Sequence, residues 1–81
     1  MVYYLAMKFN QCKKEIVQYI LDYENSKVFL TPSIEVFNYV FDDKYTPEEI
    51  SKNSLDLVFL GILESYGWFK YLRLTKTIKF S

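Results

Sequence analysis

Apolar side chains between residues 11 and 23 recur at intervals of three and four positions, which is the period of an amphipathic helix. The recurring apolar positions are Cys12, Ile16, Tyr19, Ile20 and Tyr23. Polar residues fill the positions between them, and Glu24-Asn25-Ser26 follow as a stop signal. The pattern predicts a helix from about Gln11 to Tyr23. The aromatic segment up to Phe9 is compatible with either a strand or a lead-in to this helix.

A short β-prone run and a second helix follow. The sequence Lys-Val-Phe-Leu at residues 27–30 predicts a short strand. Thr31 can cap a helix, and Pro32 suits the first helical position, where a missing N–H costs nothing. We expect this helix to end near Asp42-Asp43 and to turn its apolar residues mostly inward. Those residues are Ile34, Phe37, Tyr39, Val40 and Phe41.

A third helix has a clearer start at residues 46–49, Thr-Pro-Glu-Glu. The threonine hydroxyl can accept from the N–H of the second glutamate, whose carboxylate can reach back to the threonine N–H. Both glutamates also suit the positive end of the helix dipole. We expect this helix to run toward Tyr66, with a break near Asn53-Ser54, and Gly67 to follow it as a left-handed terminal residue.

The period changes to two after Gly67. Residues 68–80 alternate in the way that is typical of β structure. Thirteen residues are long for one strand, so we predict a C-terminal hairpin that turns near Leu74–Thr77. A single long strand pairing with the N-terminal segment is the alternative, because the turn region lacks the Gly, Asn or Asp that hairpin turns favour.

The predicted order of helix, short strand, helix, helix and hairpin is that of a winged helix. The segment Ile62-Leu63-Glu64-Ser65-Tyr66-Gly67-Trp68-Phe69 resembles the leucine-glutamate-x-x-glycine-apolar-apolar signature with which winged helices leave the recognition helix and enter the wing. The small, Tyr-rich, His-free composition also resembles that of winged-helix proteins from archaeal viruses and plasmids. The resemblance implies one α+β winged-helix domain over residues 1–81, with three helices and a C-terminal β-hairpin.

The amino-acid composition excludes several kinds of functional site. The 81-residue chain has no His and one Cys, which excludes a disulfide framework, a structural zinc site and His-based catalysis within one chain. Cys12 lies on the apolar side of the first helix and is expected to be buried, with an intermolecular disulfide or a reactive thiol as the alternatives. The carboxylate pairs Asp42-Asp43 and Glu48-Glu49 lie at helix ends, where capping and dipole effects explain them without acid–base catalysis. We therefore expect no enzyme, no metal and no cofactor.

The chain also lacks targeting signals. Its start has no basic region followed by an apolar run and a cleavage site. The longest apolar run, residues 57–63, is far shorter than the ~20 residues that span a bilayer. We expect an intracellular, cytoplasmic protein, in the host cell if it is viral, with no membrane partner.

The net charge is zero, but the acidic and basic residues are distributed unevenly along the chain. Residues 1–14 carry three lysines and no acid, residues 15–65 carry all ten acids and three lysines, and residues 66–81 carry four basic residues and no acid. A basic wing could meet DNA phosphates, although lysines on an edge strand also protect against edge-to-edge pairing. The residues expected to contact double-stranded DNA are Lys52, Asn53, Ser54, Lys70, Arg73, Lys76 and Lys79.

The predicted third helix is apolar nearly all round between Leu57 and Leu63, which is unlike a helix that reads the major groove. One side of this helix would face the core, so we expect the other side to contact a second subunit or a partner protein through Val58, Phe59 and Ile62. The alternative is that the small core surrounds the helix on both sides. The sequence thus predicts a DNA-binding, dimeric winged-helix regulator of transcription that acts by occupying its site. A non-enzymatic protein-interaction module is the alternative.

Overall fold

The computed structural model describes residues 9–75 of the chain. Within this range three helices are followed by an antiparallel hairpin. The elements are α2 (Gln11–Glu24), α3 (Ile34–Val40), α4 (Pro47–Phe59), β1 (Leu63–Tyr66) and β2 (Tyr71–Leu74). The described part of the chain thus has the predicted α+β class.

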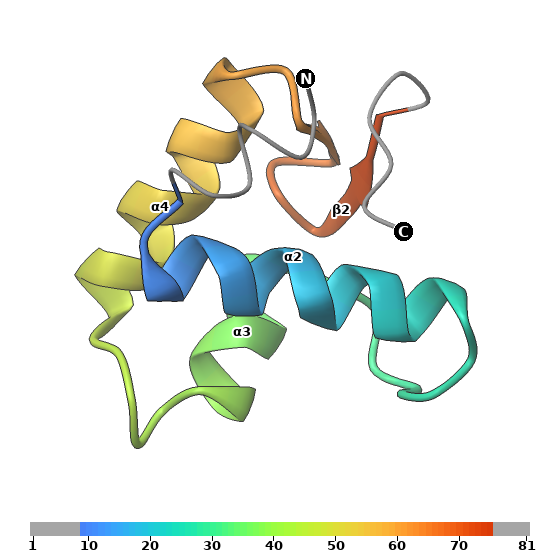
Figure 1. Cartoon of the computed structure of the whole chain (residues 1–81), viewed down its shortest axis with the longest axis horizontal. Coiled ribbons are helices and arrows are strands. Elements are labelled where there is room, and N and C mark those ends of the chain that lie inside the picture. Colours follow the sequence, from blue (N-terminus) through green and yellow to red (C-terminus); the bar gives the residue numbers. More distant parts are fainter. Residues whose placement is uncertain (1–8, 76–81) are drawn as a thin grey trace.

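The helix α2 lies across the middle of the molecule, with α4 crossing one of its ends, the hairpin above it and α3 below it (Figure 1). Contacts join α2 to α4 and β2, α3 to α4, and α4 to β1. The apolar side chains that are completely buried come from every element or its flanks. They are Ile16, Ile20, Phe37, Ile50, Leu57, Ile62 and Leu72.

The predicted first helix is confirmed. The side chain of Asn10 caps α2 by accepting a hydrogen bond from the Lys13 N–H at 2.8 Å. The helix ends at the predicted stop, where Ser26 takes a positive φ of 61°. Cys12 is buried, as expected.

The strand predicted at residues 27–30 is wrong. These residues pair with no described strand, and the Phe29 side chain is 90% exposed. One backbone hydrogen bond, from the Leu72 N–H to the Pro32 carbonyl at 2.9 Å, ties the following segment to β2. The chain is still extended at Ser33, which caps α3 in place of the predicted Thr31 by accepting from the Val36 N–H.

The side chains of α3 that point inward also differ from the prediction. Phe37 is fully buried and Phe41 packs against the core one turn further on. Tyr39 and Val40, which we expected to face the core, are exposed. The helix ends at Val40, before the predicted aspartates, and the Tyr45 N–H then bonds back to the Phe41 carbonyl.

The predicted capping box at the start of α4 is confirmed, because Thr46 and Glu49 exchange both hydrogen bonds. The predicted length is wrong: α4 runs without the expected break and ends at Phe59 instead of near Tyr66. Gly61, with φ of 78°, terminates it. Its N–H bonds to the Val58 carbonyl and that of Ile62 to the Leu57 carbonyl, which is the pattern of a Schellman motif.

The hairpin therefore lies earlier in the chain than the sequence predicts. Leu63 pairs with Leu74 and Tyr66 with Tyr71, so the turn falls on residues 67–70 and not near Leu74–Thr77. Gly67 is left-handed as predicted, but it begins a hairpin turn and does not end a helix. The C-terminal part of the predicted hairpin, from residue 76, lies outside the described residues.

Candidate interaction surface

The two faces of α4 differ sharply in chemistry. The inward face carries four buried residues, Ile50, Asn53, Ser54 and Leu57. The face on the opposite side, called here the outward face, carries exposed residues at spacings of four, three and four. These residues are Glu48, Lys52, Leu55 and Phe59.

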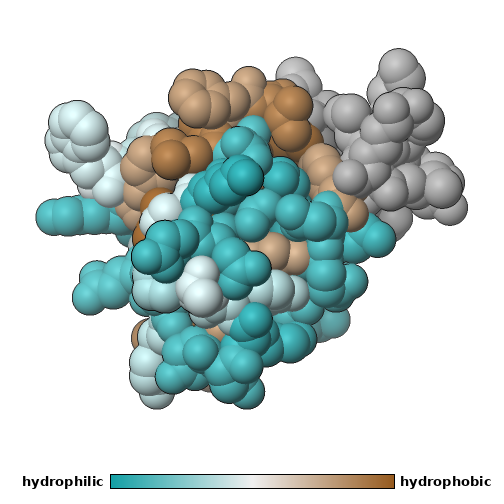
Figure 2. All heavy atoms as spheres, turned by 90° about the vertical axis from the view of Figure 1, so that its left-hand side faces the viewer, coloured by the Kyte–Doolittle hydropathy of each residue, from teal (hydrophilic) through white to brown (hydrophobic). Residues whose placement is uncertain are grey.

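The outward face changes from charged to apolar along the helix. Phe59 is 83% exposed, and the neighbouring Leu55 and Leu60 are exposed as well. We call these three residues the apolar end of α4. Figure 2 shows hydrophobic atoms gathered at the top of the α4 side of the molecule, where the helix ends, above a largely hydrophilic surface.

Only part of the interface predicted from Val58, Phe59 and Ile62 is available to a partner. Ile62 is fully buried, because the chain has turned back toward the core beyond Gly61, and Val58 packs against the core. Phe59 is the member that projects outward. The interface expectation is therefore corrected, with Ile62 assigned to the core.

The residues expected to contact DNA bases occupy inward positions, apart from the exposed Lys52. Asn53 is 7% exposed and its oxygen accepts from Asn10 Nδ2 at 2.9 Å and from Lys13 Nζ at 2.8 Å, while its Nδ2 donates to the Glu49 carbonyl at 2.7 Å. The Ser54 hydroxyl is buried with no hydrogen-bond partner among the described residues. Asn53 and Ser54 therefore have structural positions that cannot present them to a duplex.

The Lys13 ammonium joins two elements. Besides Asn53 it contacts the Asp56 carboxylate at 3.2 Å. Its side chain is only 14% exposed, so its charge is largely shielded from solvent and is balanced within the fold. This lysine of the basic N-terminal segment therefore serves the contact between α2 and α4.

The hairpin cations differ from one another. Arg73 Nε lies 2.9 Å from Glu64 Oε1, and its guanidinium carbon lies 5.4 Å from the centre of the Tyr66 ring. The Glu64 carboxylate also accepts from the Tyr66 hydroxyl, and this bond raises the pKa of Tyr66. Lys70 is exposed and has no ion pair among residues 9–75. Lys76 and Lys79 lie outside the described residues.

The turn of the hairpin is left-handed over three consecutive residues. Gly67, Trp68 and Phe69 have φ of 60°, 58° and 67°. Non-glycine residues pay about 1–2 kcal/mol each for this conformation. Phe69 packs against the core, and its carbonyl accepts a hydrogen bond from the Ile34 N–H, so its contacts stabilise the fold. The Trp68 indole, in contrast, is 93% exposed.

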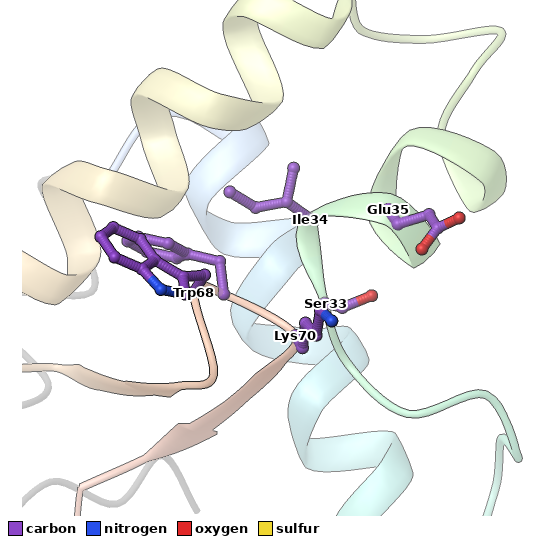
Figure 3. Close-up of a pocket in the computed structure, with 6 residues that line it drawn as sticks. Ser33, Ile34, Glu35, Trp68 and Lys70 are labelled. Atoms are coloured by element: carbon purple, nitrogen blue, oxygen red, sulfur yellow. The ribbon is translucent and has the colours of Figure 1, made fainter.

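An open hollow of about 600 Å³ lies between this turn and the start of α3. Figure 3 shows the Trp68 ring and the Ile34 side chain turned toward one another, while the Glu35 carboxylate points away. Ser33, Phe69 and Lys70 complete the lining. The lining is mixed, with three apolar residues and three polar or charged ones.

A polar cluster joins α2 to the turn that precedes α4. The Glu15 carboxylate accepts from Lys44 Nζ at 2.8 Å and from the Tyr45 hydroxyl at 2.9 Å. The bond from Lys44 lowers the pKa of Glu15. Burial of the phenol, together with its bond to Glu15, raises the pKa of Tyr45 to about 12. The cluster fixes the turn and neutralises the Lys44 charge.

Residues 9–75 contain no group of three or more His, Cys, Asp or Glu side chains that could hold a metal ion. Burial raises the pKa of the Cys12 thiol, which disfavours the reactive thiolate. Among the same residues no helix has the length and apolar character needed to cross a membrane.

Comparisons of the chain with protein-family models, with curated proteins and with solved structures give no match.

Proposed function

We propose that this chain is a non-enzymatic protein-interaction module of winged-helix topology, and that it binds its partner through the outward face of α4. The observation that carries this proposal is the exposure of Phe59 beside Leu55 and Leu60, while Asn53 and Ser54 of the same helix are buried. Aromatic side chains exposed in this way are the usual anchors of protein interfaces.

The order of the elements supports the winged-helix part of the proposal. Three helices precede a hairpin, and α4 occupies the position of a recognition helix. The hydrogen bond from Leu72 to Pro32 places the segment before α3 beside β2, where a winged helix has its first strand. Residues 67–70 correspond to the tip of the wing.

The energetics favour a protein partner over a duplex at α4. Burying a large apolar side chain contributes about 1.5–3 kcal/mol, so Phe59 and its neighbours can supply binding energy to an apolar partner. A duplex would instead meet Glu48 and Glu49 at the start of the helix, where carboxylates repel phosphates.

Binding of double-stranded DNA through the wing is the second candidate function. The exposed Lys70 beside Trp68 and the concentration of basic residues after residue 66 favour it. Gel-shift titration with duplex DNA at two salt concentrations tests it directly. Binding through four to six phosphates would weaken with a log–log slope of roughly −4 to −5, and no binding at low salt would exclude this function.

Selection from an unbiased peptide library tests the interaction module. We expect the wild-type chain to enrich peptides whose binding is lost in Phe59→Lys and kept in Lys14→Glu, which changes an exposed residue of α2. Peptides that bind Phe59→Lys as well as wild type would overturn the proposal.

The expected homodimer is a special case of this proposal. Sedimentation of the wild type and of Phe59→Lys at tens of micromolar distinguishes it. A dimer that dissociates on substitution identifies a second copy as the partner, and a wild-type monomer removes the homodimer.

A further inference from the structure

We infer that the partner is an amphipathic helix in which lysines or arginines adjoin an apolar stripe, and that it lies along the outward face of α4. This inference rests on the proposed function and adds the chemistry of the partner to it. It follows from the length of the face, its gradient of polarity and the charges around its first turn.

The length of the outward face suits a helix. Glu48 and Phe59 are eleven positions apart, which corresponds to about 16 Å along the axis and about three turns. Side chains at spacings of three and four form a straight ridge on the helix surface. A partner helix can pack such a ridge between its own side chains, with its apolar stripe against Leu55, Phe59 and Leu60.

The opposite end of the face is negatively charged. The exposed carboxylates of Asp42, Asp43 and Glu48 make no ion pair with any other residue of the described range. Glu49 beside them is held in the capping box. Lys44 is paired with Glu15 at 2.8 Å, and Lys52, the one cation of the outward face, is outnumbered by these three carboxylates. Basic residues of a partner would therefore find unpaired carboxylates two or more turns away from the apolar contact.

The same charges disfavour the two other occupants of this face. A second copy that packed α4 against α4 in antiparallel fashion would place Glu48 of each chain opposite Phe59 of the other. A duplex would bring phosphates to the carboxylates of the turn and the first helical turn. A basic, amphipathic helix is complementary to both ends of the face.

Two synthetic helices of about 18 residues test the inference. Both carry the same Leu and Phe stripe, and they differ in having Lys or Glu at the positions beside it. We expect the Lys helix to bind at least tenfold more tightly, because several exposed ion pairs of 0.2–1 kcal/mol each separate the two. We expect Phe59→Ala to weaken binding of both helices.

Charge reversal in the protein supplies the matched comparison. Glu48→Lys should reduce the preference for the Lys helix, whereas Glu24→Lys, the same change at the far end of α2, should leave it unchanged. Circular dichroism establishes that each variant is folded. If both helices bind equally and depend on Phe59, the inferred chemistry is wrong and the proposed function stands. If neither helix binds, the inference is wrong, and the library selection decides the proposed function separately.

Discussion

The Lys13 ammonium of α2 lies 2.8 Å from the side-chain oxygen of Asn53 in α4, and this contact connects two helices 40 positions apart in the sequence. The same oxygen accepts from Asn10, and the amide nitrogen of Asn53 donates to the backbone one turn back. Asn53 therefore satisfies donors from two other residues and fixes the crossing of α2 and α4. Because α4 carries the proposed interaction surface, this contact also sets how that surface is oriented on the fold.

Asn53→Ala should destabilise the protein by about 2 kcal/mol. The substitution removes the acceptor for two donors, and loss of a partner for buried polar groups costs 1–3 kcal/mol. Urea denaturation followed by circular dichroism measures the change. Lys52→Ala, at the exposed neighbouring position, is the control and should lie within about 0.5 kcal/mol of wild type. Equal stability of the two variants would contradict the role given to Asn53.

Ser54→Ala, in contrast, should make the protein more stable. The Ser54 hydroxyl is buried and has no hydrogen-bond partner in the described structure, so the substitution removes an unsatisfied group and keeps the β-carbon. We expect a gain of about 1 kcal/mol, from both this term and the higher helix propensity of alanine. A destabilised Ser54→Ala would show that the hydroxyl is satisfied by a group outside the described residues or by water.

Thr46→Ala should cost about 1 kcal/mol, because it removes the acceptor for the Glu49 N–H at the start of α4. For a domain of this size the loss corresponds to a fall of roughly 4–8 °C in Tm. Thr46→Ser keeps the hydroxyl and should recover most of the loss. A Tm for the serine variant as low as that of the alanine variant would argue against the capping box.

Trp68→Asn should stabilise the fold by about 0.5–1 kcal/mol. Asparagine tolerates the left-handed conformation better than tryptophan, and the exposed indole gives up little contact when it is removed. Trp68→Val is the contrasting variant, since a β-branched residue disfavours positive φ and should destabilise the turn. Urea midpoints measured by circular dichroism separate the two, and equal midpoints would contradict the turn geometry.

Tyr45 should titrate later than an ordinary tyrosine. The pKa of Tyr45 is raised to about 12 in the folded protein, above its ordinary value of 10. Because the raised pKa favours the protonated phenol in the native state, the associated stability is fully present below pH 10 and is lost as the pH rises toward 12. Absorbance titration of the phenolates measures this directly. Tyr45→Phe should remove the late step, and its persistence in that variant would assign it to another tyrosine.

Local rules predicted the elements that depend on local contacts. The period of apolar residues located α2 to within one residue at its C-terminal end. The sequence Thr-Pro-Glu-Glu located the start of α4, because the capping box is satisfied by residues three positions apart. The two partners of the capping box lie on the same turn of helix, and the apolar period of α2 repeats every three or four residues, so both signals are visible in the sequence.

The end of α4 could not be predicted in the same way. The apolar run at residues 57–63 continues a helical pattern, but it fits a buried strand equally well once Gly61 has reversed the chain. The pairing of Glu64 with Arg73 holds the following residues as a strand, and that contact is non-local. Gly61 was the available signal, since a glycine inside an apolar run can be a helix terminus.

Because the end of α4 was predicted too late in the chain, most of the candidate surface was not predicted. With α4 extended to Tyr66, Ile62 falls on a helix face beside Phe59, whereas the true end sends it into the core. A helix that ends before Gly61 does not include Ile62. Counting from Glu48 in steps of four, three and four reaches Leu55 and Phe59 directly.

The exposure of Trp68 has a practical consequence for anyone who studies this protein by fluorescence. It is the only tryptophan in the chain, and its ring is already surrounded by solvent in the native state. Its emission should therefore change little when the protein unfolds. A shift to shorter wavelength on mixing with another molecule would report that something has covered the tip of the hairpin, which makes this residue a built-in optical sensor of contact and a poor gauge of folding.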